Sequence, residues 1–212
     1  MTVLLSVAVV CASAFALRAL RRRPALELPG IRPQVGIEAP TLLGNRRAFT
    51  EALDVEVSRC TRTGSHASLL VIGLDSELWR GQADSCAQGA LAEVIRTRVR
   101  GEDHGYRLDA DEFAMILPGK RGEGALVAAT RIEAAFLASG GLAGSLTAGI
   151  AQLEPGIDRH VLLRHAYSAM LAAGRGGRSR LLLYSPELEH ASSALALVHP
   201  AAYFEAVDGP AA

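Results

Sequence analysis

The 212-residue chain lacks the cysteine pattern and the net charge that mark several large classes of protein. Its three cysteines, Cys11, Cys60 and Cys86, are odd in number and widely spaced, which excludes a disulfide framework and the ligand spacing of a zinc site. The 22 basic and 22 acidic residues cancel, so the broad attraction that general nucleic-acid binding needs is missing. All but one of the basic residues are arginines, which leaves room for a local anion site.

Half of the residues are apolar, which fits one globular domain with short extensions. Residues 21–37 contain a Pro- and Gly-rich stretch without a sustained period, which is typical of a linker. Helical spacing follows at residues 46–60, 90–99, 125–137 and 158–173, and strand patterns at 68–75, 106–108, 112–117, 144–152 and 180–184. This alternation predicts an α/β domain over residues 38–188, one sheet covered by helices, with a tail at 189–212.

The first residues contain an apolar run. Residues 2–17 are uncharged, and Arg18 and Arg21–Arg23 follow them. A helix of 16 to 20 residues spans roughly 24 to 30 Å, so residues 1–20 are predicted to form a single transmembrane anchor. The arginines after the run predict that the domain lies in the cytoplasm, at a bacterial inner membrane. A cleaved signal peptide is the alternative, because Ala12–Ala14 is a suitable cleavage site.

Four segments in order resemble the GGDEF family, which includes the diguanylate cyclases, and together they cover about residues 38–186. They are EAPTLLGNRRAF at 38–49, LLVIGLD at 69–75, DADEFAMILP at 109–118 and GRSR at 177–180. They match the family's opening motif, the strand that ends in D-x-D, the GGDEF signature with its strand, and the closing G-R-N-R. The resemblance implies a palm-like sheet of the nucleotidyl cyclase kind, with the signature at the tip of a central hairpin.

The resemblance also implies which catalytic residues have changed. A family cyclase joins two GTP molecules and needs carboxylates that place Mg²⁺ on the triphosphate. Gly73 stands at the first aspartate of D-x-D, while Asp75 matches the second. Asp109 and Ala110 replace the two signature glycines, which in the family allow a ligand to approach the backbone closely.

What remains of the catalytic set is small. Asp75, Asp111, Glu112 and Arg178 match family positions, whereas the lysine before G-R-N-R is absent. We therefore expect no intact catalytic site, no required cofactor and no metal site. If residual cyclase activity needs Mg²⁺, Asp75 and Asp111 are the expected ligands.

The sequence also contains residues that match the family's product-binding site. The family's R-x-x-D, five residues before the signature, matches Arg100 and Asp103, and the following helix carries Arg131. An arginine fork can pair with guanine O6 and N7, and a carboxylate can accept from the guanine N–H groups. The alternative is that the arginine and the aspartate form only a surface ion pair and bind no ligand. The resemblance implies that Arg100, Asp103 and Arg131 bind cyclic di-GMP.

The prediction is thus a membrane-tethered, degenerate GGDEF domain that senses cyclic di-GMP. It would act on an unknown protein partner, such as another GGDEF protein or a second copy in a dimer. Two alternatives stay open: a weak diguanylate cyclase, and a scaffold that binds no nucleotide. GKRGEG at 119–124 lacks a Walker loop's glycine and Ser/Thr, so it is predicted to be a polar connection.

Overall fold

The computed structural model describes residues 36–38, 41–74, 84–98, 101–141, 145–175 and 180–188. The predicted anchor at 1–20, most of the linker and the tail from 189 lie outside this part of the chain. Within it, no helix combines the length and apolar character needed to cross a membrane. The elements in chain order are α2 (Arg46–Thr63), β1 (Ala67–Leu74), α3 (Asp84–Arg98), β2 (His104–Arg107), β3 (Glu112–Pro118), α4 (Gly122–Ala138), β4 (Leu146–Leu153), α5 (Arg159–Arg175) and β5 (Arg180–Leu183).

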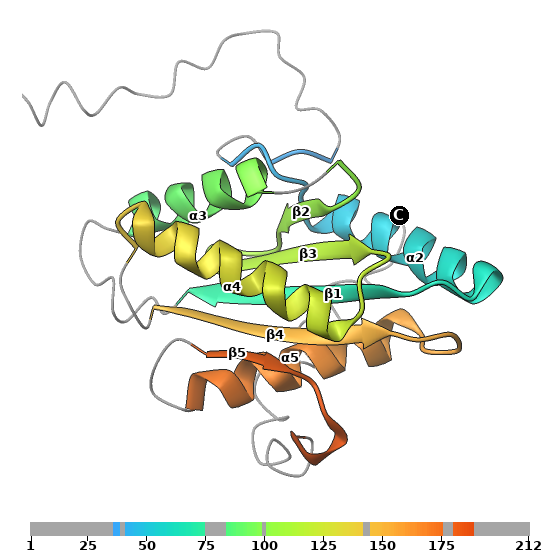
Figure 1. The fold of residues 1–212 in the computed structure, drawn as a ribbon. Coiled ribbons are helices and arrows are strands. Elements are labelled where there is room, and N and C mark those ends of the chain that lie inside the picture. The colour runs from blue at the N-terminus through green and yellow to red at the C-terminus, as the bar shows by residue number, and fades with distance from the viewer. Residues whose placement is uncertain are drawn as a thin grey trace, which may run out of the picture. The chain divides into compact units, whose positions relative to one another are not determined.

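The five strands form one mixed sheet in the order β2-β3-β1-β4-β5 (Figure 1). The central strand β1 pairs antiparallel with β3 on one side and with β4 on the other. Strand β5 pairs parallel with β4 at the far edge. Because β1 has a neighbour on each side and helices over both faces, almost all of its residues are buried, and its sequence is apolar except for Ser68.

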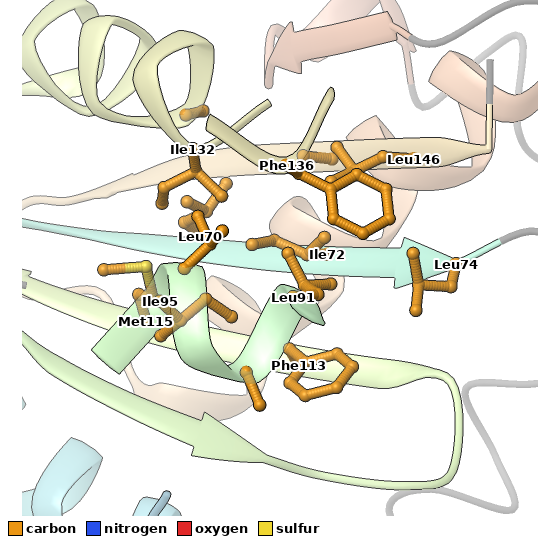
Figure 2. Close-up of a cluster of buried hydrophobic side chains, with 14 of the residues drawn as sticks. Leu70, Ile72, Leu74, Leu91, Ile95, Phe113, Met115, Ile132, Phe136 and Leu146 are labelled. Carbon is orange, nitrogen blue, oxygen red and sulfur yellow. The ribbon is translucent and has the colours of Figure 1, made fainter. Parts of the chain in front are cut away.

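Side chains alternate between the two faces of the sheet. Leu70 and Ile72 of β1 join a core cluster with α3 and α4, whereas Leu69 and Val71 join a second cluster with α2 and α5. Figure 2 shows the first cluster, which includes Phe136 of α4 together with Leu70 and Ile72 of β1. The prediction of one sheet flanked by helices is therefore confirmed. Because successive side chains of a strand point to opposite faces, the position of a residue in its strand decides whether it faces α3 and α4 or α2 and α5.

Element boundaries differ from the prediction at several ends. Helix α2 extends to Thr63 and ends at Gly64, which has a left-handed φ of 64°. The strand predicted at 106–108 lies instead at His104–Arg107. The reason is that Leu108 already belongs to the turn, where its N–H donates to the Glu112 carbonyl at 2.8 Å. Helix α3 begins at Asp84, six residues before the predicted start at Ala90.

One close approach sets the position of α5 on the sheet. Gly149 of β4 has no side chain, and a Cβ added there would lie 2.0 Å from the Ala166 carbonyl oxygen and 2.3 Å from the Met170 nitrogen. Both atoms belong to the backbone of α5. The helix therefore lies directly against the backbone of β4.

We predict that Gly149→Ala lowers the free energy of unfolding by about 2 to 3 kcal/mol, because the added methyl group forces α5 away from the sheet. Gly89→Ala is the matched control: it lies within α3 and its added Cβ would meet nothing within 4 Å. In a helix this change should stabilise by roughly 0.5 to 1 kcal/mol. Urea unfolding followed by circular dichroism measures both, and equal shifts in the two variants would contradict the packing argument.

Candidate functional site

The turn between β2 and β3 carries the sequence that matches the signature. Its backbone is closed by hydrogen bonds between residues 108–109 and Glu112. The Asp109 carboxylate accepts from the Ala110 N–H at 2.7 Å, and the Asp111 carbonyl accepts from the Leu74 N–H at 2.9 Å. The last contact places the turn beside the end of β1. Asp109 and Ala110 are both exposed.

A single arginine connects this turn to its surroundings. Arg107 donates to the carbonyl oxygens of Asp109 and Ala110 at 3.1 and 3.0 Å. It also pairs with Glu38 at 2.7 Å and donates to Gln88 of α3 at 2.8 Å. Its side chain is only 13% exposed. Sequence reasoning missed this role, although the hairpin pattern places Arg107 opposite the first apolar residue of β3.

A second arginine approaches the turn from α2. Arg46 donates to the Leu108 carbonyl from Nε and Nη2 at 3.1 and 2.9 Å, and its Nη2 lies 3.6 Å from the Asp109 carboxylate. Arg46 belongs to the segment that matches the family's opening motif. Together with Arg107 it places positive charge beside the carboxylate that replaces a signature glycine. The turn therefore accommodates an aspartate when no ligand is bound.

The two acidic remnants in the signature point to different helices. Asp111 accepts from Gln88 Nε2 of α3 at 2.9 Å, and Glu112 accepts from the Tyr167 hydroxyl of α5 at 3.1 Å. Helices α3 and α5 cover opposite faces of the sheet. Mg²⁺ needs oxygen ligands that converge at about 2.1 Å in an octahedron. In this arrangement Asp111 and Glu112 do not fit one shared ion.

Gly73 lies next to Glu112 in the register of β1 and β3. A Cβ at Gly73 would lie 3.3 Å from both the Met170 Sδ and the Thr147 Oγ1. The position of the missing D-x-D aspartate is thus bordered by a methionine and a threonine. Asp75 and Arg178 lie outside the described residues. Among the residues that are described, no three His, Cys, Asp or Glu side chains gather as a metal site would require.

The second predicted site lies at the other end of the hairpin. Asp103, just before β2, has a buried side chain that is 7% exposed, and Arg131 is an exposed residue of α4. Both line an open groove of about 870 Å³ between the end of α3 and one side of α4. Arg100 lies outside the described residues. The structure therefore brings together two of the three predicted ligand-binding residues.

Asp103 has an ion-pair partner that sequence reasoning missed. The Lys120 ammonium contacts the Asp103 carboxylate, and Lys120 also lines the groove. Residues 119–121 connect β3 to α4, whereas residues 122–124 of the predicted polar connection form the first turn of α4. A signal for the pair existed in the hairpin register, since β3 runs antiparallel to the strand that Asp103 precedes. Asp103 is therefore a buried carboxylate that is paired with Lys120.

Comparisons with known proteins identify the family of the domain. The family model "Diguanylate cyclase, GGDEF domain" matches residues 38–180. The diguanylate cyclase DosC of Escherichia coli K12 is 28% identical over 169 residues, which cover 74% of this chain and 37% of DosC. DgcS of Shewanella oneidensis is 29% identical over 156 residues, which cover 69% of this chain and 52% of DgcS. The matched part of the chain thus spans about a third to a half of these relatives.

Solved structures show the same fold. The GGDEF domain of DgcB from Caulobacter crescentus, in complex with c-di-GMP, has a TM-score of 0.65 at 24% identity and covers 72% of this chain and 98% of its own. The GGDEF domain of PA1120 (YfiN) from Pseudomonas aeruginosa has a TM-score of 0.64 at 28% identity, with coverage of 74% and 99%. With the family model matched over most of the domain, the chain belongs to the GGDEF domain family of diguanylate cyclases.

Proposed function

We propose that this chain is a receptor for cyclic di-GMP, built on a GGDEF domain that no longer makes the nucleotide. The observation that carries the proposal is the groove in which the buried Asp103 carboxylate and the Arg131 guanidinium lie together. These two residues come from segments far apart in the chain. Their spacing from the signature is the one expected of a product-binding site, and Arg100 would complete it.

The chemistry of the groove suits this ligand. A carboxylate accepts from guanine N1–H and the exocyclic amine, and an arginine fork donates to guanine O6 and N7. Among the described residues, Arg98, Lys120 and Arg131 line the groove against one acidic residue, Asp103, so the charge of the groove complements a ligand with two phosphates. A volume of about 870 Å³ lies within the range of sites for small molecules.

Loss of synthesis is supported by the turn and its neighbours. Gly73 provides no carboxylate, and Asp111 and Glu112 are bonded to helices on opposite faces of the sheet. The signature glycines are replaced by Asp109 and Ala110. A carboxylate at Asp109 would also repel a triphosphate that approached the turn.

We further propose that residues 1–20 tether the domain to the inner membrane, with the domain in the cytoplasm. The support is the uncharged run at residues 2–17 with arginines after it. The ligand would act by favouring one of two conformations or assemblies, which requires different affinities for the two. The partner would be another GGDEF protein, a second copy of this chain or a different protein.

The binding proposal predicts that cyclic di-GMP titrated into the 212-residue chain gives saturable heat. Asp103→Asn and Arg131→Ala should each weaken binding by about tenfold to a hundredfold, because each removes a base contact worth about 1 to 3 kcal/mol. Arg100→Ala should have a similar effect.

Arg62→Ala is the matched control for the arginine variants. Arg62 is an exposed residue in the last turn of α2, the helix that packs on the opposite face of the sheet. It should leave the affinity unchanged. If the unaltered protein gives no binding heat at high micromolar ligand, the receptor proposal is wrong. A scaffold that binds no nucleotide is then the better interpretation.

A separate prediction concerns turnover. The chain incubated with GTP and Mg²⁺ should release no pyrophosphate and form no cyclic di-GMP by chromatography. Gly73→Asp alone should not restore activity, because the restored carboxylate still lacks a convergent partner at Asp111. Product formation by the unaltered chain would show that it is a weak cyclase instead, whatever the binding experiment gives.

A further inference from the structure

Lys120 is the only lysine of the chain, and its backbone is fixed in the groove wall. Its carbonyl accepts from the Ser68 hydroxyl of β1 at 2.9 Å, and its N–H donates to the Leu117 carbonyl at 3.3 Å. The preceding Gly119 has a φ of 71° and donates to the His66 carbonyl at 2.8 Å. These contacts hold the start of the side chain in place, so its ammonium reaches Asp103 from a defined point.

The ion pair engages Asp103, the acidic residue of the groove. Lys120 Nζ contacts Asp103 Oδ1, and the two side chains are 24% and 7% exposed. An ammonium donates hydrogen bonds and accepts none, as do the N1–H and amine of a guanine edge. The lysine and a guanine therefore need the same acceptor oxygens. A carboxylate has about four lone-pair sites, but the Asp103 side chain is only 7% exposed and the ammonium already covers Oδ1, so a guanine edge that needs both oxygens from the groove side has to displace the lysine.

We propose that Lys120 is an internal competitor for Asp103 that sets the affinity of the groove for cyclic di-GMP. This inference rests on the proposed receptor function. In the free protein the ammonium satisfies the buried carboxylate; on binding, the guanine edge replaces it and the flexible lysine stem turns outward. The ligand must therefore break a partly buried ion pair before it gains its own contact.

The sign of a substitution follows from the burial of the pair. Removing the ammonium takes away the one ion-pair partner that Asp103 has among the described residues, and a buried charge that loses its partner is costly to the free protein. The ligand relieves this cost when it binds. Attraction between the displaced ammonium and a ligand phosphate acts across an open, solvated groove and is the weaker effect. Loss of the lysine charge should thus tighten binding.

The test compares three proteins in calorimetric titrations with cyclic di-GMP: the unaltered chain, Lys120→Met and Lys120→Arg. Methionine keeps an unbranched stem and removes the charge, so affinity should rise by about tenfold, the equivalent of a pair worth 1.4 kcal/mol. Arginine keeps a donor for Asp103 and should change affinity by about twofold or less. Lys120→Met should also lower the melting temperature of the free protein, and saturating ligand should restore it.

A measurement on the unaltered protein does not depend on the variants folding. Because Lys120 is the sole lysine, ¹³C-labelled lysine gives one Cε–Hε signal in the NMR spectrum. Cyclic di-GMP should shift this signal toward the position it has in Asp103→Asn, where the ion pair is absent. A signal that stays in place at saturation would overturn the competition.

The outcomes separate the two proposals. Binding by the unaltered chain with equal or weaker affinity in Lys120→Met would overturn the competitor and leave the receptor standing. Binding by Lys120→Met alone would support the competitor and show that the lysine closes the site. No binding by any of the three proteins would overturn both.

Discussion

Strand β1 is hydrogen-bonded along its length to β3 on one side and β4 on the other, and both of its faces are covered by helices. This double pairing sets the register of three strands at once. It places Gly73 beside Glu112 and Thr147, and it brings the signature turn to the end of β1 through the Leu74–Asp111 hydrogen bond. A slip of one residue would exchange the two core clusters, so burial protects the register strongly.

The β2–β3 hairpin, which β1 supports, carries both regions of interest at its two ends. At one end Arg107 joins the turn to Glu38 and α3. At the other end Asp103 precedes β2 and Lys120 follows β3. The same register therefore positions the signature turn and the groove. The backbone pairing that holds both ends is continuous, so a side-chain change at the turn leaves the frame of the groove in place.

Electrostatic balance differs between the two ends. At the turn, Arg46 pairs with the Asp109 carboxylate, and Arg107 donates to the Asp109 carbonyl oxygen, so the charge introduced by the glycine replacement has a guanidinium partner. The groove combines one buried carboxylate with several cations. An overall formal charge of zero hides this local difference. The proposed binding of an anionic ligand therefore depends on the charges of one surface and not on the overall composition.

The sequence by itself determined the fold class, the family, the strand β1 and the approximate bounds of most elements. Hydrophobic period reports local burial, and the family motifs lie at fixed spacing along the chain. It also singled out Asp103 and Arg131, which the structure places in one groove. Helix α3 was the exception, because its first turn has no strong apolar period to mark its start.

Only the tertiary structure decided which partners these residues have. The side chains of the adjacent residues Asp111 and Glu112 bond to Gln88 and Tyr167, which lie on helices packed on opposite faces of the sheet. The contact of Lys120 with Asp103 depends on the hairpin register and on Ser68 of β1. Such contacts join residues 17 to 55 positions apart. Spacing along the chain cannot report them, because strand pairing and helix packing bring them together.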